Sequence, residues 1–240
     1  MFSKYKSNED PYVIAEIGQN HQGDLEKARE FIRIFAFEGA NAVKFQTRNN
    51  SVLFSDEAYN KKYESENAFA ETYGAHREKL ELDLEWLPIL KQDCIDHGVD
   101  FMSTPFDEPS LEALISLDVD VIKIASFDLG NLPFIKKIAE SKKPIVMSIG
   151  GGKIDQIRSS IDLILKHHDD VALLHCVSEY PCEYNRLGLS NIEVLLEEFP
   201  SITIGSSDHF NGTLSGPVAF MLGARVFEKH VTLNRAWPGT

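Results

Sequence analysis

Residues 12–47, YVIAEIGQNHQGDLEKAREFIRIFAFEGANAVKFQT, contain one complete strand–helix–strand unit. Two short apolar runs, Tyr12–Gly18 and Ala42–Thr47, flank a segment in which apolar residues recur every three to four positions. This spacing predicts an amphipathic helix, which Asp24 can cap and Gly39 can end. Two strands that are joined through a helix run parallel, with a right-handed crossover. The unit therefore predicts a parallel sheet.

The same alternation continues along the rest of the chain. Six further apolar runs are predicted as strands, at Asp100–Pro105, Val121–Ser126, Pro144–Gly150, Val171–Ser178, Thr203–His209 and Arg225–Leu233. Apolar residues at helical spacing lie between them, for example from Ile154 to Leu165 and from Ile192 to Phe199. Eight such strands fit a (β/α)₈ TIM barrel better than an open sheet of about five or six strands. We expect residues 1–240 to form a single barrel domain.

The composition indicates a soluble enzyme rather than a nucleic-acid-binding or membrane protein. The formal net charge is −13, and no cluster of Lys and Arg is present that could neutralise phosphates. Apolar residues make up 43% of the chain, which suffices for a core, yet no apolar run approaches the roughly 20 residues of a membrane helix. The three cysteines form no CxxC pair and no signal peptide is visible, so we expect a cytoplasmic protein.

Two features depart from a regular barrel. Residues 48–80 form a long polar connection that contains several aromatic residues, and a lid or a dimer element explains it better than a disordered linker. The sequence also ends seven residues after the last predicted strand, Arg225–Leu233, which leaves no room for an eighth helix. We expect a truncated barrel from a longer protein.

Polar residues gather at the C-terminal ends of the predicted strands. They are Glu16, Gln46, Thr104, Ser126, Ser148, Ser178, His209 and His230. Barrel enzymes carry their active sites at this face, although a single Ser or Thr can be polar there merely because the strand end meets solvent. The charged residues Glu16, Lys44 and Lys123 argue more strongly for a site, because a charge inside an apolar strand is costly unless it is paired or used.

Two histidines indicate a candidate metal site. Residues two apart on a strand share a face, so Ser207 points with His209 and Glu228 with His230. On neighbouring strands the two imidazoles can share a cation, with waters in a shell that suits Mn²⁺ or Mg²⁺. Two hydrogen-bonded histidines without a metal are the alternative. His175 can be a third ligand or an orienting partner, and the predicted metal set excludes it.

Lys44 and Lys123 supply two positive charges inside the predicted barrel. The hydroxyl groups that can join them in a pocket for a phosphate and a carboxylate belong to Thr104, Ser126, Ser148 and Ser207. Either lysine can instead be a Schiff-base nucleophile, or form a structural ion pair with Glu16 or Glu228. The spacing leaves these alternatives open. We expect the histidine pair to face this anion pocket.

Seven short blocks follow one another along the chain and fall on predicted strand ends. They are Ala15–His21, Val43–Thr47, Ser103–Asp107, Ile122–Ser126, Leu174–Cys176 with Tyr180-Pro181, Gly205–His209, and Phe227–His230 followed by Pro238-Gly239. Each block alone is weak, but their collinear order is specific. The series resembles the sialic acid (N-acetylneuraminate) synthase family, which includes legionaminic and pseudaminic acid synthases.

The resemblance implies an enzyme that condenses phosphoenolpyruvate with an N-acetylmannosamine-like aldehyde and releases phosphate by C–O cleavage. It implies His209 and His230 as ligands of a divalent metal, Mn²⁺ or Mg²⁺. Implied phosphoenolpyruvate contacts are Lys44, Thr104, Lys123, Ser126, Ser148 and Ser207. Implied sugar contacts are Gln46, Ser178 and Tyr180, and the implied catalytic carboxylates are Glu16 and Glu228. We expect Glu16 to handle the proton of the attacking water, with Glu228 as the rival.

The resemblance also implies a homodimer and a C-terminal antifreeze-like domain, which we expect to be absent from residues 1–240. Two positions depart from the family pattern: Ser178 replaces the usual Asn, and Ser148-Ile149-Gly150-Gly151 replaces Ser-Thr-Gly-Met. Two other hypotheses remain. One is a different phosphoenolpyruvate-dependent keto-acid synthase or a Schiff-base aldolase, and the other is a non-catalytic barrel that binds a sugar or an anion.

Overall fold

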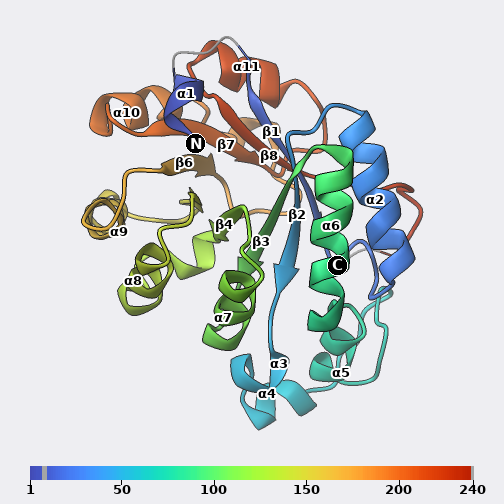
Figure 1. Cartoon of the computed structure of the whole chain (residues 1–240). Coiled ribbons are helices and arrows are strands. Elements are labelled where there is room, and N and C mark those ends of the chain that lie inside the picture. The colour runs from blue at the N-terminus through green and yellow to red at the C-terminus, as the bar shows by residue number, and fades with distance from the viewer. Residues whose placement is uncertain (7–9, 239–240) are drawn as a thin grey trace. The chain divides into compact units, whose positions relative to one another are not determined.

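The structure, a computed structural model, describes residues 1–6 and 10–238 (Figure 1). The strands follow one another in chain order in a closed barrel, which confirms the predicted (β/α)₈ fold. They are β1 (Tyr12–Gly18), β2 (Ala42–Thr47), β3 (Asp100–Pro105), β4 (Val121–Ile124), β5 (Ile145–Ser148), β6 (Val171–Cys176), β7 (Thr203–Asp208) and β8 (Val226–His230). Gly239, the last residue of the family-like blocks, lies outside the described residues.

The first three strands have the predicted bounds, whereas the other five are shorter than predicted. Ser126 starts a 3₁₀ turn, η2 (Ser126–Asp128), instead of ending β4. Ser178 and His209 lie just beyond the ends of β6 and β7. An apolar run cannot show where the ladder of hydrogen bonds stops, because this depends on where the neighbouring strand turns away.

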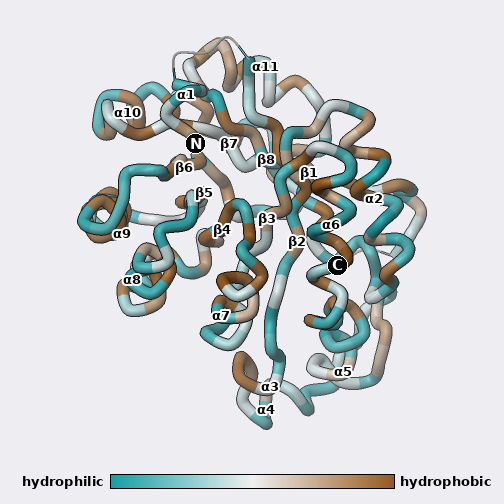
Figure 2. Tube along the Cα trace, viewed as in Figure 1, coloured by the Kyte–Doolittle hydropathy of each residue, from teal (hydrophilic) through white to brown (hydrophobic). Residues whose placement is uncertain are grey.

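Helices connect the strands, and their ends follow the local signals. The longer ones are α2 (Leu25–Phe37), α6 (Leu87–His97), α7 (Glu108–Ser116), α8 (Leu132–Glu140), α9 (Ile154–Leu165), α10 (Asn191–Glu198) and α11 (Ser215–Met221); α1 (Ser3–Lys6) precedes β1. Asp24 caps α2 by accepting a hydrogen bond from the Lys27 amide at 3.0 Å, and Gly39 follows with a φ of +91°. Figure 2 shows the alternation of apolar and polar residues along α2 and α8.

The long connection after β2 is folded. It contains α3 (Asn50–Leu53), α4 (Asp56–Asn60), α5 (Tyr73–Glu78) and η1 (Leu84–Trp86), and a second short 3₁₀ turn, η3 (Tyr184–Arg186), follows β6. Aromatic rings pack within the connection, with ring centroids 5.2 Å apart for Phe54 and Tyr73 and 4.4 Å apart for Tyr63 and His76. This packing agrees with an ordered element, and its role as a lid or a dimer contact stays a prediction.

The chain divides into two compact units, and one of the three division points along the chain lies inside β1. The first unit contains Met1–Ile14 and Asp120–His230, and the second contains Ala15–Val119 and the described residues from Val231 onward. In the first unit α8 packs on α9, and in the second α2 packs on α6 (Figure 1). Among the described residues, no helix combines the length and the apolar character that crossing a bilayer requires.

Strand register in the first unit places polar residues on one face. Cys176 of β6 pairs with Ser207 of β7, which pairs with Glu228 of β8. Two residues earlier in each of these strands, the same face is closely packed around Gly205. A Cβ atom on Gly205 would lie 2.1 Å from the Val226 carbonyl oxygen, so only glycine fits there.

In the second unit, the register of β2 and β3 also places polar residues on one face. Lys44 pairs with Met102 and Gln46 with Thr104, so these side chains share a face. On the opposite face the rings of Phe45 and Phe101 are stacked, with centroids 5.7 Å apart, and the hydroxyl groups of Thr47 and Ser103 are hydrogen-bonded to each other. Packing of this face fixes the register, and the register fixes which polar side chains meet.

Candidate active site

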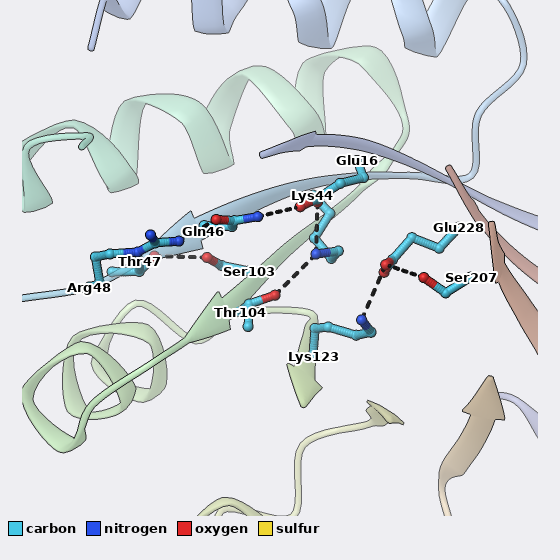
Figure 3. Close-up of polar contacts among 10 residues, drawn as sticks. All are labelled: Glu16, Lys44, Gln46, Thr47, Arg48, Ser103, Thr104, Lys123, Ser207 and Glu228. Atoms are coloured by element: carbon cyan, nitrogen blue, oxygen red, sulfur yellow. Dashed lines mark hydrogen bonds and ion pairs between the residues drawn. The ribbon is translucent and has the colours of Figure 1, made fainter. Parts of the chain in front are cut away.

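The second unit holds a buried group of polar residues, the Lys44 cluster, which comprises Glu16, Lys44, Gln46 and Thr104 (Figure 3). Lys44 Nζ lies 2.7 Å from Glu16 Oε2 and donates a hydrogen bond to Thr104 Oγ1 at 3.0 Å. Gln46 Nε2 donates to Glu16 Oε1 at 2.8 Å. Glu16, Lys44 and Thr104 are each 2% exposed. Four residues predicted separately from the sequence thus form one hydrogen-bonded group.

The Lys44 cluster continues into Arg48, Glu81 and Gln19, which are not among the site residues predicted from the sequence. The Arg48 guanidinium donates to Gln46 Oε1, and its Nε lies 3.4 Å from Glu81 Oε1. Gln19 Nε2 donates to the same Glu81 oxygen at 2.7 Å. Arg48 extends the two-residue alternation of Lys44 and Gln46, which is the only sequence signal for it. Glu81 lies far along the chain and carries no signal.

Burial perturbs both members of the Arg48–Glu81 pair. Burial raises the pKa of Glu81 to about 7, although Arg48 acts in the opposite direction. Burial also lowers the pKa of Arg48 below its ordinary value, with Glu81 opposing the shift. A carboxyl group that titrates near neutrality is typical of functional sites more than of structural ones.

The first unit holds a second buried group, the Lys123 cluster, which comprises Lys123, Ser207 and Glu228 (Figure 3). Lys123 Nζ donates to Glu228 Oε1 at 3.1 Å, and Ser207 Oγ donates to the same oxygen at 3.0 Å. Their exposed fractions are 3%, 5% and 6% for Lys123, Ser207 and Glu228. The ion pairs foreseen as one alternative for the two lysines are therefore both formed, here with Glu228 and at Lys44 with Glu16.

Three serines of the first unit, which we call the serine cradle, lie near Gly150: Ser126 and Ser178 face it, and Ser148 ends β5 two residues before it. The Gly150 amide donates to Ser126 Oγ at 2.8 Å, and a Cβ atom on Gly150 would lie 2.2 Å from Ser178 Oγ. The Ser148 hydroxyl is buried and has no hydrogen-bond partner within the described residues. A buried hydroxyl without a partner costs free energy, so the serine cradle fits an anionic ligand that would supply the missing partner.

The two predicted metal ligands lie close together in the first unit. The ring centroids of His209 and His230 are 5.7 Å apart. His209 Nδ1 lies 2.7 Å from the Val177 carbonyl oxygen; because a carbonyl only accepts, Nδ1 carries the proton and Nε2 has the lone pair. The Tyr180 ring covers His209 at 3.9 Å between centroids. An imidazole nitrogen oriented by a backbone carbonyl is a typical metal donor, so His209, with the His230 ring beside it, fits a divalent cation.

Two neighbouring residues complete this region. Burial raises the pKa of the Cys176 thiol, but the neighbouring His209, Lys123 and Ser126 together outweigh burial and leave that pKa below its ordinary value. His175 Nε2 lies 2.8 Å from the Leu187 carbonyl oxygen. Within residues 1–6 and 10–238, no three His, Cys, Asp or Glu side chains are grouped to hold a metal.

The fold and these clusters define a class: a (β/α)₈ barrel with buried lysine–carboxylate pairs, hydroxyl groups and two imidazoles at the carboxyl ends of its strands, where barrel enzymes carry their active sites. Comparison of the sequence then defines the family. The chain belongs to the NeuB family, whose model matches residues 31–240.

Named relatives agree with this assignment. The N-acetylneuraminate-9-phosphate synthase of Drosophila melanogaster is 38% identical over 230 residues, which are 95% of this chain and 62% of that protein. The N,N'-diacetyllegionaminic acid synthase of Legionella pneumophila is 36% identical over 234 residues, 95% of this chain and 65% of that protein. The chain thus spans less than two thirds of these relatives.

A solved structure agrees with the fold. The crystal structure of N-acetylneuraminic acid synthetase from Leptospira borgpetersenii superposes with a TM-score of 0.84 and 31% identity, and covers 94% of this chain and 74% of that one. The resemblance found in the seven sequence blocks is confirmed at the level of family and fold.

Proposed function

We propose that this chain is the catalytic barrel of a nonulosonic acid synthase, which joins phosphoenolpyruvate to an amino-sugar aldehyde. The observation that carries the proposal is the presence of two buried lysines on barrel strands, each ion-paired with a glutamate. Lys44 pairs with Glu16 and donates to Thr104, and Lys123 pairs with Glu228, which also accepts a hydrogen bond from Ser207. The named relatives support it, because both are synthases of sialic-type acids.

Phosphoenolpyruvate carries a phosphate and a carboxylate, and both lysine clusters offer what these groups require. In the first unit we assign Lys123, Ser126, Ser148 and Ser207 to this substrate; in the second unit we assign Lys44 and Thr104. The glutamates compensate the lysine charges while no substrate is bound, which keeps the ammonium groups buried and in place. Preorganised donors of this kind stabilise charge that develops during a reaction.

The reaction follows from the electronic structure of the substrates. C3 of phosphoenolpyruvate attacks the aldehyde carbon of the sugar and forms the new C–C bond, while the aldehyde oxygen gains an electron pair and takes up a proton to become a hydroxyl group. Water adds to C2, and the tetrahedral intermediate expels phosphate by cleavage of the C–O bond. Glu16 accepts the proton of the attacking water. The ion pair with Lys44 and the hydrogen bond from Gln46 orient its carboxylate. Glu228 is the second candidate for this proton.

The sugar and the metal involve residues at the ends of the strands or just beyond them. We assign Gln46, Ser178 and Tyr180 to the sugar; Tyr180 is 67% exposed and available to a ligand. His209 and His230 would hold a divalent cation, Mn²⁺ or Mg²⁺, with waters as its remaining ligands. Such a cation would polarise the aldehyde oxygen as a Lewis acid. The homodimer and the cytoplasmic location expected from the sequence stay predictions.

Phosphate release tests the proposal. The full-length protein is incubated with phosphoenolpyruvate and each of three aldehyde sugars: N-acetylmannosamine, its 6-phosphate and a 2,4-diacetamido sugar. We expect release with one of them, loss of release with a chelator, and recovery with Mn²⁺. Phosphoenolpyruvate labelled with ¹⁸O at its bridging oxygen should deliver the label to phosphate. Glu16→Gln should lower kcat roughly 10²–10⁴-fold, while the exposed control Glu30→Gln should not.

Other outcomes identify the competing functions. Covalent trapping of pyruvate by borohydride at Lys123 would indicate an aldolase. Binding of phosphoenolpyruvate without phosphate release, for every sugar in the panel, would indicate a binding protein.

A further inference from the structure

The Lys44 cluster does not end at Gln46. An unbroken series of contacts runs from Glu16 through the Gln46 amide to Arg48, then to Glu81 and finally to Gln19. All these residues belong to the second unit. We propose that Arg48 and Glu81 are positioning residues that fix the orientation of the Gln46 amide and, through it, the carboxylate of Glu16. This inference rests on the role of Glu16 in the proposed function.

The chemistry of the three side chains allows only one orientation of the amide. A guanidinium can only donate hydrogen bonds, and an ionised carboxylate can only accept them. Gln46 lies between Arg48 and Glu16, so its carbonyl oxygen must face Arg48 and its amino group must face Glu16, as the structure shows. Without Arg48, Glu16 alone in this contact series would orient the amide, and a flip would then cost only the hydrogen bond to Glu16 and place an oxygen against its carboxylate.

Arg48 itself has little freedom to move. Its side chain is 6% exposed. The guanidinium lies over the Phe106 ring, 4.3 Å from the centroid, and its Nε faces Glu81 at 3.4 Å. A planar guanidinium that is stacked on one side and ion-paired at its edge keeps its donors in one direction. The donor that reaches Gln46 is therefore held in place from two separate segments of the chain.

Glu81 is itself held by the loop that follows β1. Gln19, in this loop, donates a hydrogen bond to Glu81 at 2.7 Å. Gly23, in the same loop, lies against the segment before Glu81: a Cβ atom on Gly23 would lie 2.3 Å from the Lys79 carbonyl oxygen. Burial raises the pKa of Glu81 to about 7, so the site keeps a carboxyl group whose charge is unfavourable there. A role in orienting Arg48 explains why such a group is present.

A double-mutant cycle in the full-length protein tests the inference. Arg48→Met should lower kcat about tenfold or more, because a hydrogen bond to a charged group is lost, and should leave the KM for phosphoenolpyruvate within about twofold. In a Gln46→Ala background the same change should lower kcat less than about twofold, because the residue through which Arg48 acts is gone. Arg48→Lys, which keeps a donor, should recover part of kcat.

A matched control separates positioning from a general loss of an ion pair. Arg29 belongs to the same unit, is 43% exposed at its side chain and pairs with Asp93, so Arg29→Met removes a surface pair and should leave kcat unchanged. Thermal unfolding of every variant shows whether it is folded. An equal loss of kcat upon Arg48→Met with and without Gln46 would overturn the inference, since it would show a structural role.

A second measurement does not depend on turnover. The side-chain amide signal of Gln46 in a ¹⁵N spectrum, assigned by its loss in Gln46→Leu, should be protected from solvent exchange in the wild type and in Arg29→Met. Protection should be lost in Arg48→Met and reduced in Glu81→Gln. Full protection in Arg48→Met would overturn the inference. If the wild type shows protection but no phosphate release with any sugar, the proposed function fails while the positioning of Gln46 stands.

Discussion

Lys123 Nζ lies 3.1 Å from Glu228 Oε1, and Ser207 donates to the same oxygen. Both charged side chains are almost inaccessible to water, so each compensates the charge of the other. Removal of one partner of a buried pair typically costs about 3–5 kcal/mol, because a charge is left buried, whereas neutralising both costs much less.

Lys123→Met should therefore lower the free energy of unfolding by about 3 kcal/mol, and the double variant Lys123→Met/Glu228→Gln should recover most of this loss. Urea denaturation measures both values. Neither variant should use phosphoenolpyruvate at the wild-type KM and kcat. A double variant as unstable as the sum of its single variants would contradict the coupling.

His209→Ala should abolish metal-dependent turnover and leave the protein folded. The imidazole contributes its Nε2 to the proposed cation site, and its loss leaves His230 as the only assigned protein ligand. Mn²⁺ binding, followed by electron paramagnetic resonance, should weaken at least about tenfold, whereas the exposed control His97→Ala should bind as the wild type does. Full activity of the wild type in metal-free buffer would exclude this role.

Acid should destabilise the protein through His21. This side chain is completely buried, and burial lowers its pKa from 6.5 to about 4. Between these two pH values the unfolded chain binds a proton that the folded chain does not, so the free energy of unfolding falls as the pH decreases from 6.5 to 4. The contribution is complete above pH 6.5 and amounts to about 3 kcal/mol at most.

The variant His21→Asn isolates this contribution. The asparagine can still accept a hydrogen bond from the Gly23 amide, as His21 Nδ1 does at 3.1 Å. The free energy of unfolding of His21→Asn, measured by urea denaturation at pH 7 and at pH 4.5, should decrease less between these pH values than that of the wild type. His97→Asn, which alters an exposed histidine, should keep the wild-type slope. Parallel curves for all three proteins would refute the assignment.

Gly205→Ala should destabilise the first unit. The added methyl group would meet the Val226 carbonyl oxygen at 2.1 Å and Leu174 Cδ2 at 2.5 Å, and overpacking of this kind costs about 1–3 kcal/mol. Gly216→Ala is the matched control: it lies in α11 with nothing within 4 Å and should be neutral or stabilising by up to about 1 kcal/mol. Thermal unfolding compares the two, and equal Tm values would contradict the prediction.

The sequence by itself determined the order of the strands and helices, the barrel class and the family. Strand and helix periods, caps and glycine ends are local signals, which is why Tyr12–Gly18 and Asp24 are correct without tertiary information. The residue types at the strand ends also identified the members of both lysine clusters, because a charge in an apolar strand stands out in any fold.

Only the tertiary structure decided which of these residues meet. Lys123 and Glu228 are separated by 105 positions, and Gln19 and Glu81 by 62, so strand register and loop packing choose the partners. The same holds for Glu81, whose raised pKa comes from burial and whose position in the chain carries no signal. Burial and distance are properties of the folded chain, and they turned a set of candidate residues into two ion pairs and a fixed amide.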